Sequence, residues 1–168
     1  VSITVNPATP KTFALRIRVP QRDVSRLYQS SPAADGIRSL VLNGKPVTPK
    51  IENGYAVIHR EWKAGDQVGF EIPLAVQRVK TIDQVPANRG RIALRYGPLV
   101  YNIEQADGNN LDAVLKPDAP LTAEWNPKLL GGVMVIQGAF ADGSKLTAIP
   151  NYARLNRGGR SLVWIRDR

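Results

Sequence analysis

Short segments in which apolar and polar residues alternate recur along the whole chain. In the clearest one, residues 13–19, every second residue from Phe13 to Val19 is large and apolar. A period of two places one set of side chains on each face of a β-strand. Pro20 ends the segment because proline has no N–H to donate to a sheet. No segment shows a sustained 3.6-residue period, so the pattern predicts an all-β chain.

Turn residues separate these segments and indicate how they connect. Asn43-Gly44 and Asn53-Gly54 each stand between two apolar runs. Asn-Gly is the strongest two-residue hairpin signal because both residues tolerate a positive φ. Two such pairs in succession predict a meander of short antiparallel strands. We therefore predict two consecutive antiparallel β-sandwich, jelly-roll-like domains with little or no helix.

One stretch, residues 91–104, marks the start of the second predicted domain. It reads as two strands that meet at Gly97-Pro98, where the chain must bend. Its first core layer is expected to consist of Leu94, Tyr96, Leu99 and Tyr101. A polar stretch at 81–90 precedes it and is the predicted linker. We therefore predict one domain over residues 1–82 and a second over residues 83–168.

The remaining segments give weaker expectations. We predict one strand over 68–76, at a sheet edge or with a bulge because it contains Pro73. Residues 21–36 read as a loop with one helical turn at 23–28. A continuously apolar run, residues 133–136, predicts a strand buried on both faces. Further short strands are expected at 1–5, 111–115, 121–125, 145–150 and 161–165.

The composition excludes several chemistries. The 168 residues include no cysteine and one histidine, His59, and the net charge is +9. Disulfides, thiol nucleophiles and cysteine-based zinc sites are therefore excluded, and a structural role is expected for His59. The positive charge is compatible with polyanion binding, but no nucleic-acid-binding motif accompanies it. A basic face that docks on a partner domain is the simpler interpretation.

Two groups of residues are candidates for a site. Glu104, Asp107 and Asp112 lie close in sequence, and such carboxylates can serve glycoside hydrolysis or bind Ca²⁺. Their spacing fits no calcium-loop pattern, so solvated turn residues are the alternative. The tryptophans could form a sugar-binding platform or belong to the core. They are Trp62, Trp125 and Trp164.

Several motifs, in this order, resemble a known family. They are residues 13–20, 41–47, 54–55, 60–68, 90–104, 148–152, 156–158 and 163–165. The chain resembles the C-terminal part of glycoside hydrolase family 127, the β-L-arabinofuranosidase-type enzymes. The resemblance implies an upstream (α/α)-barrel that holds the acid/base glutamate and a zinc-bound cysteine cluster with the nucleophile. None of those residues maps onto this chain, which corresponds to the two sandwich domains that follow the barrel.

The sequence also departs from the family pattern. Pro20 is followed by residues 21–24 instead of a tryptophan-containing turn, and residues 153–155 lack the aromatic that the family often has there. These departures leave the sugar specificity open. The chain starts on a strand-like segment without an initiator methionine, so we expect a fragment whose first sandwich lacks its first strand.

The resemblance implies a non-catalytic accessory region that packs on the upstream barrel, with no cofactor in this chain and zinc in the barrel. The alternative is a carbohydrate-binding module for plant-wall glycans that contain arabinose. No specific nucleic acid and no membrane span are expected. The residues predicted to contact the barrel or a glycan are Arg16, Arg18, Arg95, Tyr101, Glu104, Tyr152, Asn156 and Arg157.

Overall fold

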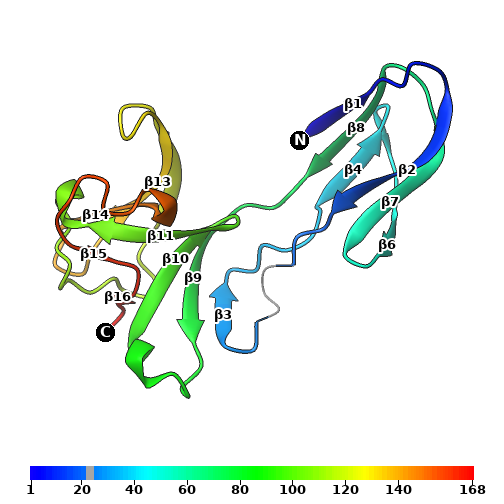
Figure 1. Ribbon diagram of the computed structural model, residues 1–168. Coiled ribbons are helices and arrows are strands. Elements are labelled where there is room, and N and C mark those ends of the chain that lie inside the picture. The colour runs from blue at the N-terminus through cyan, green and yellow to red at the C-terminus, as the bar shows by residue number, and fades with distance from the viewer. Residues whose placement is uncertain (22–24) are drawn as a thin grey trace. The chain divides into compact units, whose positions relative to one another are not determined.

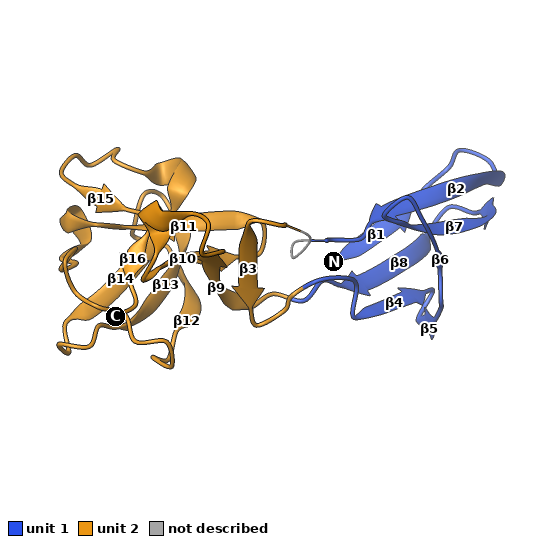
Figure 2. Cartoon of the chain, turned by 90° about the horizontal axis from the view of Figure 1, so that it is seen from below, with its two compact units in different colours: residues 1–24, 35–73 blue, residues 25–34, 74–168 orange. Residues whose placement is uncertain are grey.

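The computed structural model describes residues 1–21 and 25–168. The chain divides into two compact units (Figure 2). Unit 1 comprises the described residues of 1–24 together with 35–73, and unit 2 comprises residues 25–34 and 74–168. Within the described residues there is no α-helix, which confirms the predicted all-β class.

Unit 1 is a sandwich of two antiparallel sheets (Figure 1). One sheet has the order β1 (Ser2–Val5), β8 (Asp66–Glu71), β4 (Ser39–Leu42) and β5 (Lys45–Pro46). The other has the order β2 (Lys11–Arg18), β7 (Tyr55–Trp62) and β6 (Lys50–Glu52). Trp62 is fully buried between them, stacks on Phe13 at 5.7 Å between ring centroids, and donates its indole N–H to the Phe13 carbonyl at 3.0 Å.

Both Asn-Gly turns of unit 1 have the predicted conformation. Asn43 and Gly44 adopt φ values of 49° and 77°, and Asn53 and Gly54 adopt 50° and 78°. Positive φ at both central residues characterises the type I′ turn, whose twist matches that of the flanking strands. The turns therefore join β4 to β5 and β6 to β7 as antiparallel hairpins.

Unit 2 is built on one curled antiparallel sheet with branches (Figure 1). Its main order is β12 (Thr122–Asn126), β13 (Val133–Ala139), β14 (Lys145–Pro150), β11 (Leu99–Glu104), β10 (Arg91–Tyr96), β9 (Val76–Thr81) and β3 (Tyr28–Ser31). β15 (Ser161–Leu162) pairs with β11, and β16 (Ile165–Arg166) pairs with β10. Three 3₁₀ turns lie between strands: η1 (Pro86–Asn88), η2 (Gln105–Asp107) and η3 (Asn151–Ala153).

The core of unit 2 covers both faces of β13, as its unbroken apolar run predicts. Ile136 belongs to the larger apolar cluster with Leu94, Ile103 and Leu146. Val135 faces the other way and packs in a second cluster with neighbouring apolar residues. Strands buried on both faces have no polar side to alternate with, which explains the continuous apolar sequence.

The central stretch forms the predicted hairpin. β10 and β11 pair antiparallel around Gly97, whose φ of 58° lies in the left-handed region. Leu94 and Tyr101 are buried and Tyr96 packs against the same cluster, as expected. The expectation for Leu99 is wrong: it is 39% exposed, because it lies next to the turn at the end of the hairpin.

The division into units lies at residues 73 and 74, whereas the predicted boundary was 82 and 83. The predicted strand over 68–76 is interrupted: β8 ends at Glu71 in unit 1 and β9 begins at Val76 in unit 2. Pro73 lies in the interruption, where its missing N–H costs no ladder bond. The predicted linker at 81–90 lies inside unit 2, because β9 pairs with β10 on its other side.

Three smaller expectations were also wrong. Residues 28–31 form β3 on the edge of the unit 2 sheet instead of a loop, and the start of the predicted helical turn, 23–24, lies outside the described residues. Residues 111–115 make one isolated bridge, from Val114 to Arg166. Residues 161–165 divide into β15 and β16. No helix in the described part of the chain has the length and apolar character to cross a membrane.

Candidate functional site

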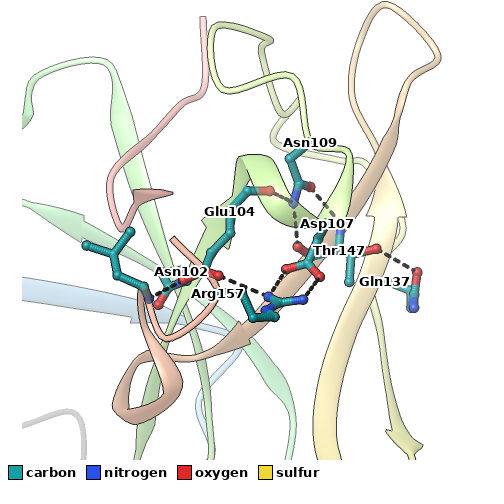
Figure 3. Close-up of polar contacts among 8 residues, drawn as sticks. Asn102, Glu104, Asp107, Asn109, Gln137, Thr147 and Arg157 are labelled. Carbon is teal, nitrogen blue, oxygen red and sulfur yellow. Dashed lines mark hydrogen bonds and ion pairs between the residues drawn. The ribbon is translucent and has the colours of Figure 1, made fainter. Parts of the chain in front are cut away.

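Two predicted site residues, Glu104 and Arg157, meet in unit 2 and form an ion cluster with Asp107 (Figure 3). The Arg157 guanidinium donates to both Asp107 carboxylate oxygens, at 2.5 and 2.7 Å, and to the Glu104 Oε2 at 3.0 Å. A planar guanidinium that holds a carboxylate with two parallel bonds is a strong and directional contact. The hydrogen bond with Asp107 is the main cause that raises the pKa of Arg157, and Glu104 adds to it.

The local fold explains how these side chains meet. Glu104 is the last residue of β11, and η2 then turns the chain so that Asp107 lies beside it. Arg157 comes from residues 151–160, which we call the clamped loop. Glu104 is fully buried, and its Oε1 accepts the backbone N–H of Leu155 at 2.6 Å. Two points of the clamped loop are therefore bound to one buried carboxylate.

Asn109 connects the same region to the neighbouring strand β14 (Figure 3). Its amide nitrogen donates to the carbonyls of Glu104 and Thr147 at 2.8 and 2.9 Å, and its amide oxygen accepts the Thr147 N–H at 2.9 Å. Asn109 is itself buried, so these bonds satisfy polar groups that would otherwise lack partners. The cluster thereby joins β11, β14 and the clamped loop.

The arrangement of these side chains is suited to holding the clamped loop in place and not to catalysis. A carboxylate that acts as general acid or nucleophile must reach a substrate, whereas Glu104 has no exposed surface and is paired with Arg157. Asp112, the third carboxylate of the predicted group, is exposed and does not join the cluster. Among the described residues, no three His, Cys, Asp or Glu side chains are grouped as metal ligands.

The clamped loop presents other predicted site residues to solvent. Tyr152 is 70% exposed, Asn156 is exposed, and the neighbouring Leu155 is 44% exposed. The Leu155 backbone adopts a φ of 61°, an uncommon conformation for a bulky residue that tertiary contacts must maintain. Its N–H bond to Glu104 is such a contact. The clamp therefore holds exposed apolar side chains in a defined position.

Tyr101 does not reach the surface as an interface residue would. It is 1% exposed, and its hydroxyl has no hydrogen-bond partner within the described residues. Burial raises its pKa to about 12, with smaller contributions from Tyr152 and Tyr96. The ring contributes to the main core of unit 2.

The three other predicted arginines do not join this cluster. On β2 of unit 1, the exposed Arg16 lies 3.7 Å from Glu52, and Arg18 lies over the Tyr55 ring at 5.3 Å. On β10 of unit 2, Arg95 donates to the Gln77 amide oxygen at 2.9 Å. The structure therefore distributes the predicted residues over separate places instead of joining them in one site.

The residues considered for other chemistry are also dispersed. His59 is exposed in the middle of β7, opposite Ala14. Trp62 is core, Trp164 is half-buried, and Trp125 on β12 is 60% exposed. The tryptophans therefore form no common platform.

Sequence reasoning missed Asn109, Thr147 and Gln77. Gln77 is fully buried and bridges strands, since it accepts from Arg95 and donates to the Pro32 carbonyl at 2.6 Å. A single polar residue carries no local signal of burial, whether it lies in a strand, as Gln77 and Thr147 do, or in a connection, as Asn109 does. Only the strand pairing, which joins residues far apart in sequence, reveals their role.

Comparison with known proteins matches nearly the whole chain. Residues 76–166 match the model of the glycoside hydrolase family 127 C-terminal domain. Residues 1–74 match the model of the beta-L-arabinofuranosidase GH127 middle domain. A curated non-reducing end beta-L-arabinofuranosidase of Bifidobacterium longum subsp. longum is 32% identical over 107 residues, which cover 58% of this chain and 16% of that protein.

Solved structures agree with these matches. A GH127 beta-L-arabinofuranosidase from Geobacillus stearothermophilus T6 is 34% identical, with a TM-score of 0.80 over 98% of this chain and 28% of that one. A GH127 beta-arabinofuranosidase is 26% identical, with a TM-score of 0.86 over 98% of this chain and 29% of that one. The chain thus spans less than a third of these relatives' length. It belongs to glycoside hydrolase family 127 and comprises that family's middle and C-terminal domains.

Proposed function

We propose that this chain is a non-catalytic accessory region of a β-L-arabinofuranosidase-type enzyme, and that it docks on and stabilises a catalytic (α/α)-barrel of the same polypeptide. The relatives it matches are such enzymes, and they are more than three times longer than their matched part. The zinc, its cysteine ligands and the acid/base glutamate belong to that barrel in this proposal. The cysteine-free sequence of this chain supplies no such ligand set.

The observation that carries the proposal is the clamped loop. Tyr152 and Leu155 are exposed apolar side chains of a loop that is bound, through the Leu155 N–H and the Arg157 guanidinium, to a fully buried carboxylate. A preorganised apolar surface loses little conformational entropy when a partner covers it. Exposed aromatic side chains are also enriched at the cores of protein interfaces. We assign this loop as the barrel-docking surface.

A turnover assay tests the non-catalytic half of the proposal. The purified 168-residue chain, shown to be folded by circular dichroism and dispersed NMR signals, should not hydrolyse nitrophenyl β-L-arabinofuranoside. Turnover by the folded chain would contradict the proposal.

Substitution of the loop in the longer enzyme tests the supporting half. We expect Tyr152→Ser with Leu155→Ser to shorten the half-life of activity on heating, with initial turnover unchanged. The matched control is Leu99→Ser, another exposed leucine of unit 2 outside the clamped loop. Equal half-lives for the loop variant and the control would contradict docking at this loop.

A second candidate function, glycan binding, is favoured by Trp125. Its ring is exposed, and it lies so close to Gly132 that a Cβ on Gly132 would lie 2.4 Å from the ring. A fixed, exposed indole is suited to stacking on a sugar. Calorimetry with arabinans and glycosylated hydroxyproline peptides should show binding that Trp125→Ala abolishes. Absence of binding would remove this candidate.

A further inference from the structure

A hollow of about 510 Å³ opens in unit 2 beside the β15–β16 connection. The side chains that carry the argument are Asn88, Arg91, Arg154, Ser161 and Trp164, all of which line it. They come from η1, from the start of β10, from the clamped loop, from β15 and, for Trp164, from the connection between β15 and β16. Neither Tyr152 nor Trp125 lines this hollow, and Arg154 is the one lining residue that it shares with the clamped loop.

The two arginines are held in place by neutral groups. Arg91 donates from Nη1 to the Trp164 carbonyl at 3.1 Å, and Arg154 donates from Nε to the Ser161 hydroxyl at 2.5 Å. In the described part of the chain, neither arginine forms an ion pair, and no Asp or Glu lines the hollow. The hollow therefore carries a positive charge that no side chain of its lining neutralises.

The geometry of Arg154 favours a planar anion. With Nε bound to Ser161, the two terminal nitrogens of the guanidinium are left for a ligand. Two parallel N–H groups match the two oxygens of a carboxylate, which is the most directional way for arginine to bind one.

Trp164 provides an aromatic surface beside the arginines, and the binding of an inorganic anion would not require such a surface. Its ring is half-buried and stacks on Tyr28 with centroids 6.2 Å apart and an interplanar angle of 21°, which fixes its orientation. An indole next to hydrogen-bonding Asn88 and Ser161 is the combination that binds a sugar ring and its hydroxyls. An inorganic anion would use the arginines alone.

We infer that this hollow binds a sugar that carries a carboxylate, a hexuronic acid residue of an acidic glycan. The carboxylate pairs with Arg154 and Arg91, the ring packs against Trp164, and the hydroxyls bond to Asn88 and Ser161. The exposed side chains proposed for docking, Tyr152 and Leu155, do not line the hollow, so binding to the 168-residue chain tests this inference apart from the docking of the barrel.

Titration of the 168-residue chain with methyl glucuronide tests the inference. Trp164→Phe assigns the Trp164 indole N–H among the three indole signals in an NMR spectrum. We expect this signal to shift saturably with methyl glucuronide. Methyl glucoside and sulfate should bind roughly tenfold more weakly or not at all, since each lacks one of the two recognised features.

A matched pair of variants separates a built site from general positive charge. Arg154→Gln should weaken methyl glucuronide binding roughly tenfold, because it removes a charge-assisted bidentate contact. Arg160→Gln removes the same charge from an exposed residue that does not line the hollow, and should change affinity less than about twofold. The inference is overturned by absence of a saturable shift, by equal affinity for sulfate or methyl glucoside, or by equal losses in the two variants.

Discussion

The two units bury different kinds of residue. In the described residues of unit 1 the core is apolar around Trp62, and one polar residue, Asp66 at the start of β8, is buried with 9% exposure. In unit 2 the core also contains fully or nearly buried polar residues. They are Gln77, Asn102, Glu104, Asn109, Thr147 and Asp167.

The contrast indicates what each unit requires for stability. An apolar core such as that of unit 1 tolerates small apolar substitutions at positions other than Trp62, and its type I′ turns are determined locally. A buried ion cluster is different, because removal of one partner leaves another charge buried without compensation. Unit 2 uses this less tolerant construction where it must hold the clamped loop, and we propose that this loop has the interface role.

The largest effect is expected from Trp62→Ala in unit 1. It removes a fully buried indole that packs on Phe13, and should lower the free energy of unfolding of unit 1 by about 3–5 kcal/mol. Urea unfolding followed by amide NMR signals of each unit measures this. Trp125→Ala, at an exposed position, is the matched control. If unit 2 lost as much stability as unit 1, the two cores would not be independent.

Arg157→Leu tests the corresponding feature of unit 2. We expect a loss of roughly 3 kcal/mol, because the buried Glu104 carboxylate then loses its guanidinium partner. The same urea experiment measures it, with signals of the clamped loop as the local probe. Arg160→Leu is the control and should stay within about 0.5 kcal/mol of the original chain. Equal stability of the two variants would show that the cluster does not stabilise unit 2.

Gly97→Val tests the β10–β11 turn. Gly97 has a φ of 58°, and an added Cβ would lie 3.1 Å from the Leu74 side chain. A β-branched residue in this conformation should destabilise unit 2 by about 2 kcal/mol. Gly97→Asn should cost less, because asparagine tolerates the left-handed region. Thermal melts compare the two, and an unchanged melting temperature for Gly97→Val would refute the role of the turn.

The smallest effect concerns acid stability of unit 1. Asp66 accepts the Lys63 N–H at 2.8 Å and the Asn43 amide at 2.7 Å, and chiefly the first of these lowers its pKa. A carboxyl with a lowered folded-state pKa stabilises the fold above its unfolded pKa, and this stability is lost as pH falls through the folded value. Asp66→Asn should therefore flatten the acid limb of unit 1 stability below about pH 4, the range of an ordinary aspartate pKa.

Glu61→Gln, at an exposed site of the same unit, provides the control for that measurement. Stability curves recorded against pH by urea unfolding should coincide for Glu61→Gln and the original chain. A curve for Asp66→Asn with the original slope would mean that this carboxylate does not contribute to unit 1 stability.

The sequence predicts unit 1 better than unit 2 for a physical reason. Asn43-Gly44 and Asn53-Gly54 are local signals, since two adjacent residues determine each turn. β3 has no such signal: Tyr28–Ser31 is short and polar, and it becomes a strand because β9 offers a free edge. Tertiary pairing overrides local pattern there.

The candidate site illustrates the same limit. Glu104 and Arg157 were both predicted to matter, but their pairing spans 53 residues of sequence. The expectation that they contact a partner directly treated them as surface residues, whereas Glu104 is fully buried. The sequence identified both residues, but only the fold shows that the buried Glu104 binds Arg157 and thereby holds the clamped loop.

Hydrogen exchange on the clamped loop tests the proposed function most directly. Amide exchange of residues 151–160 would be measured by mass spectrometry in the 168-residue chain and in the longer enzyme, with the β4–β5 turn as a reference. Docking of the barrel on Tyr152 and Leu155 predicts slower exchange of the loop in the longer enzyme, and loss of that protection with Tyr152→Ser and Leu155→Ser. Identical exchange of the loop in the chain and in the longer enzyme would contradict the proposal.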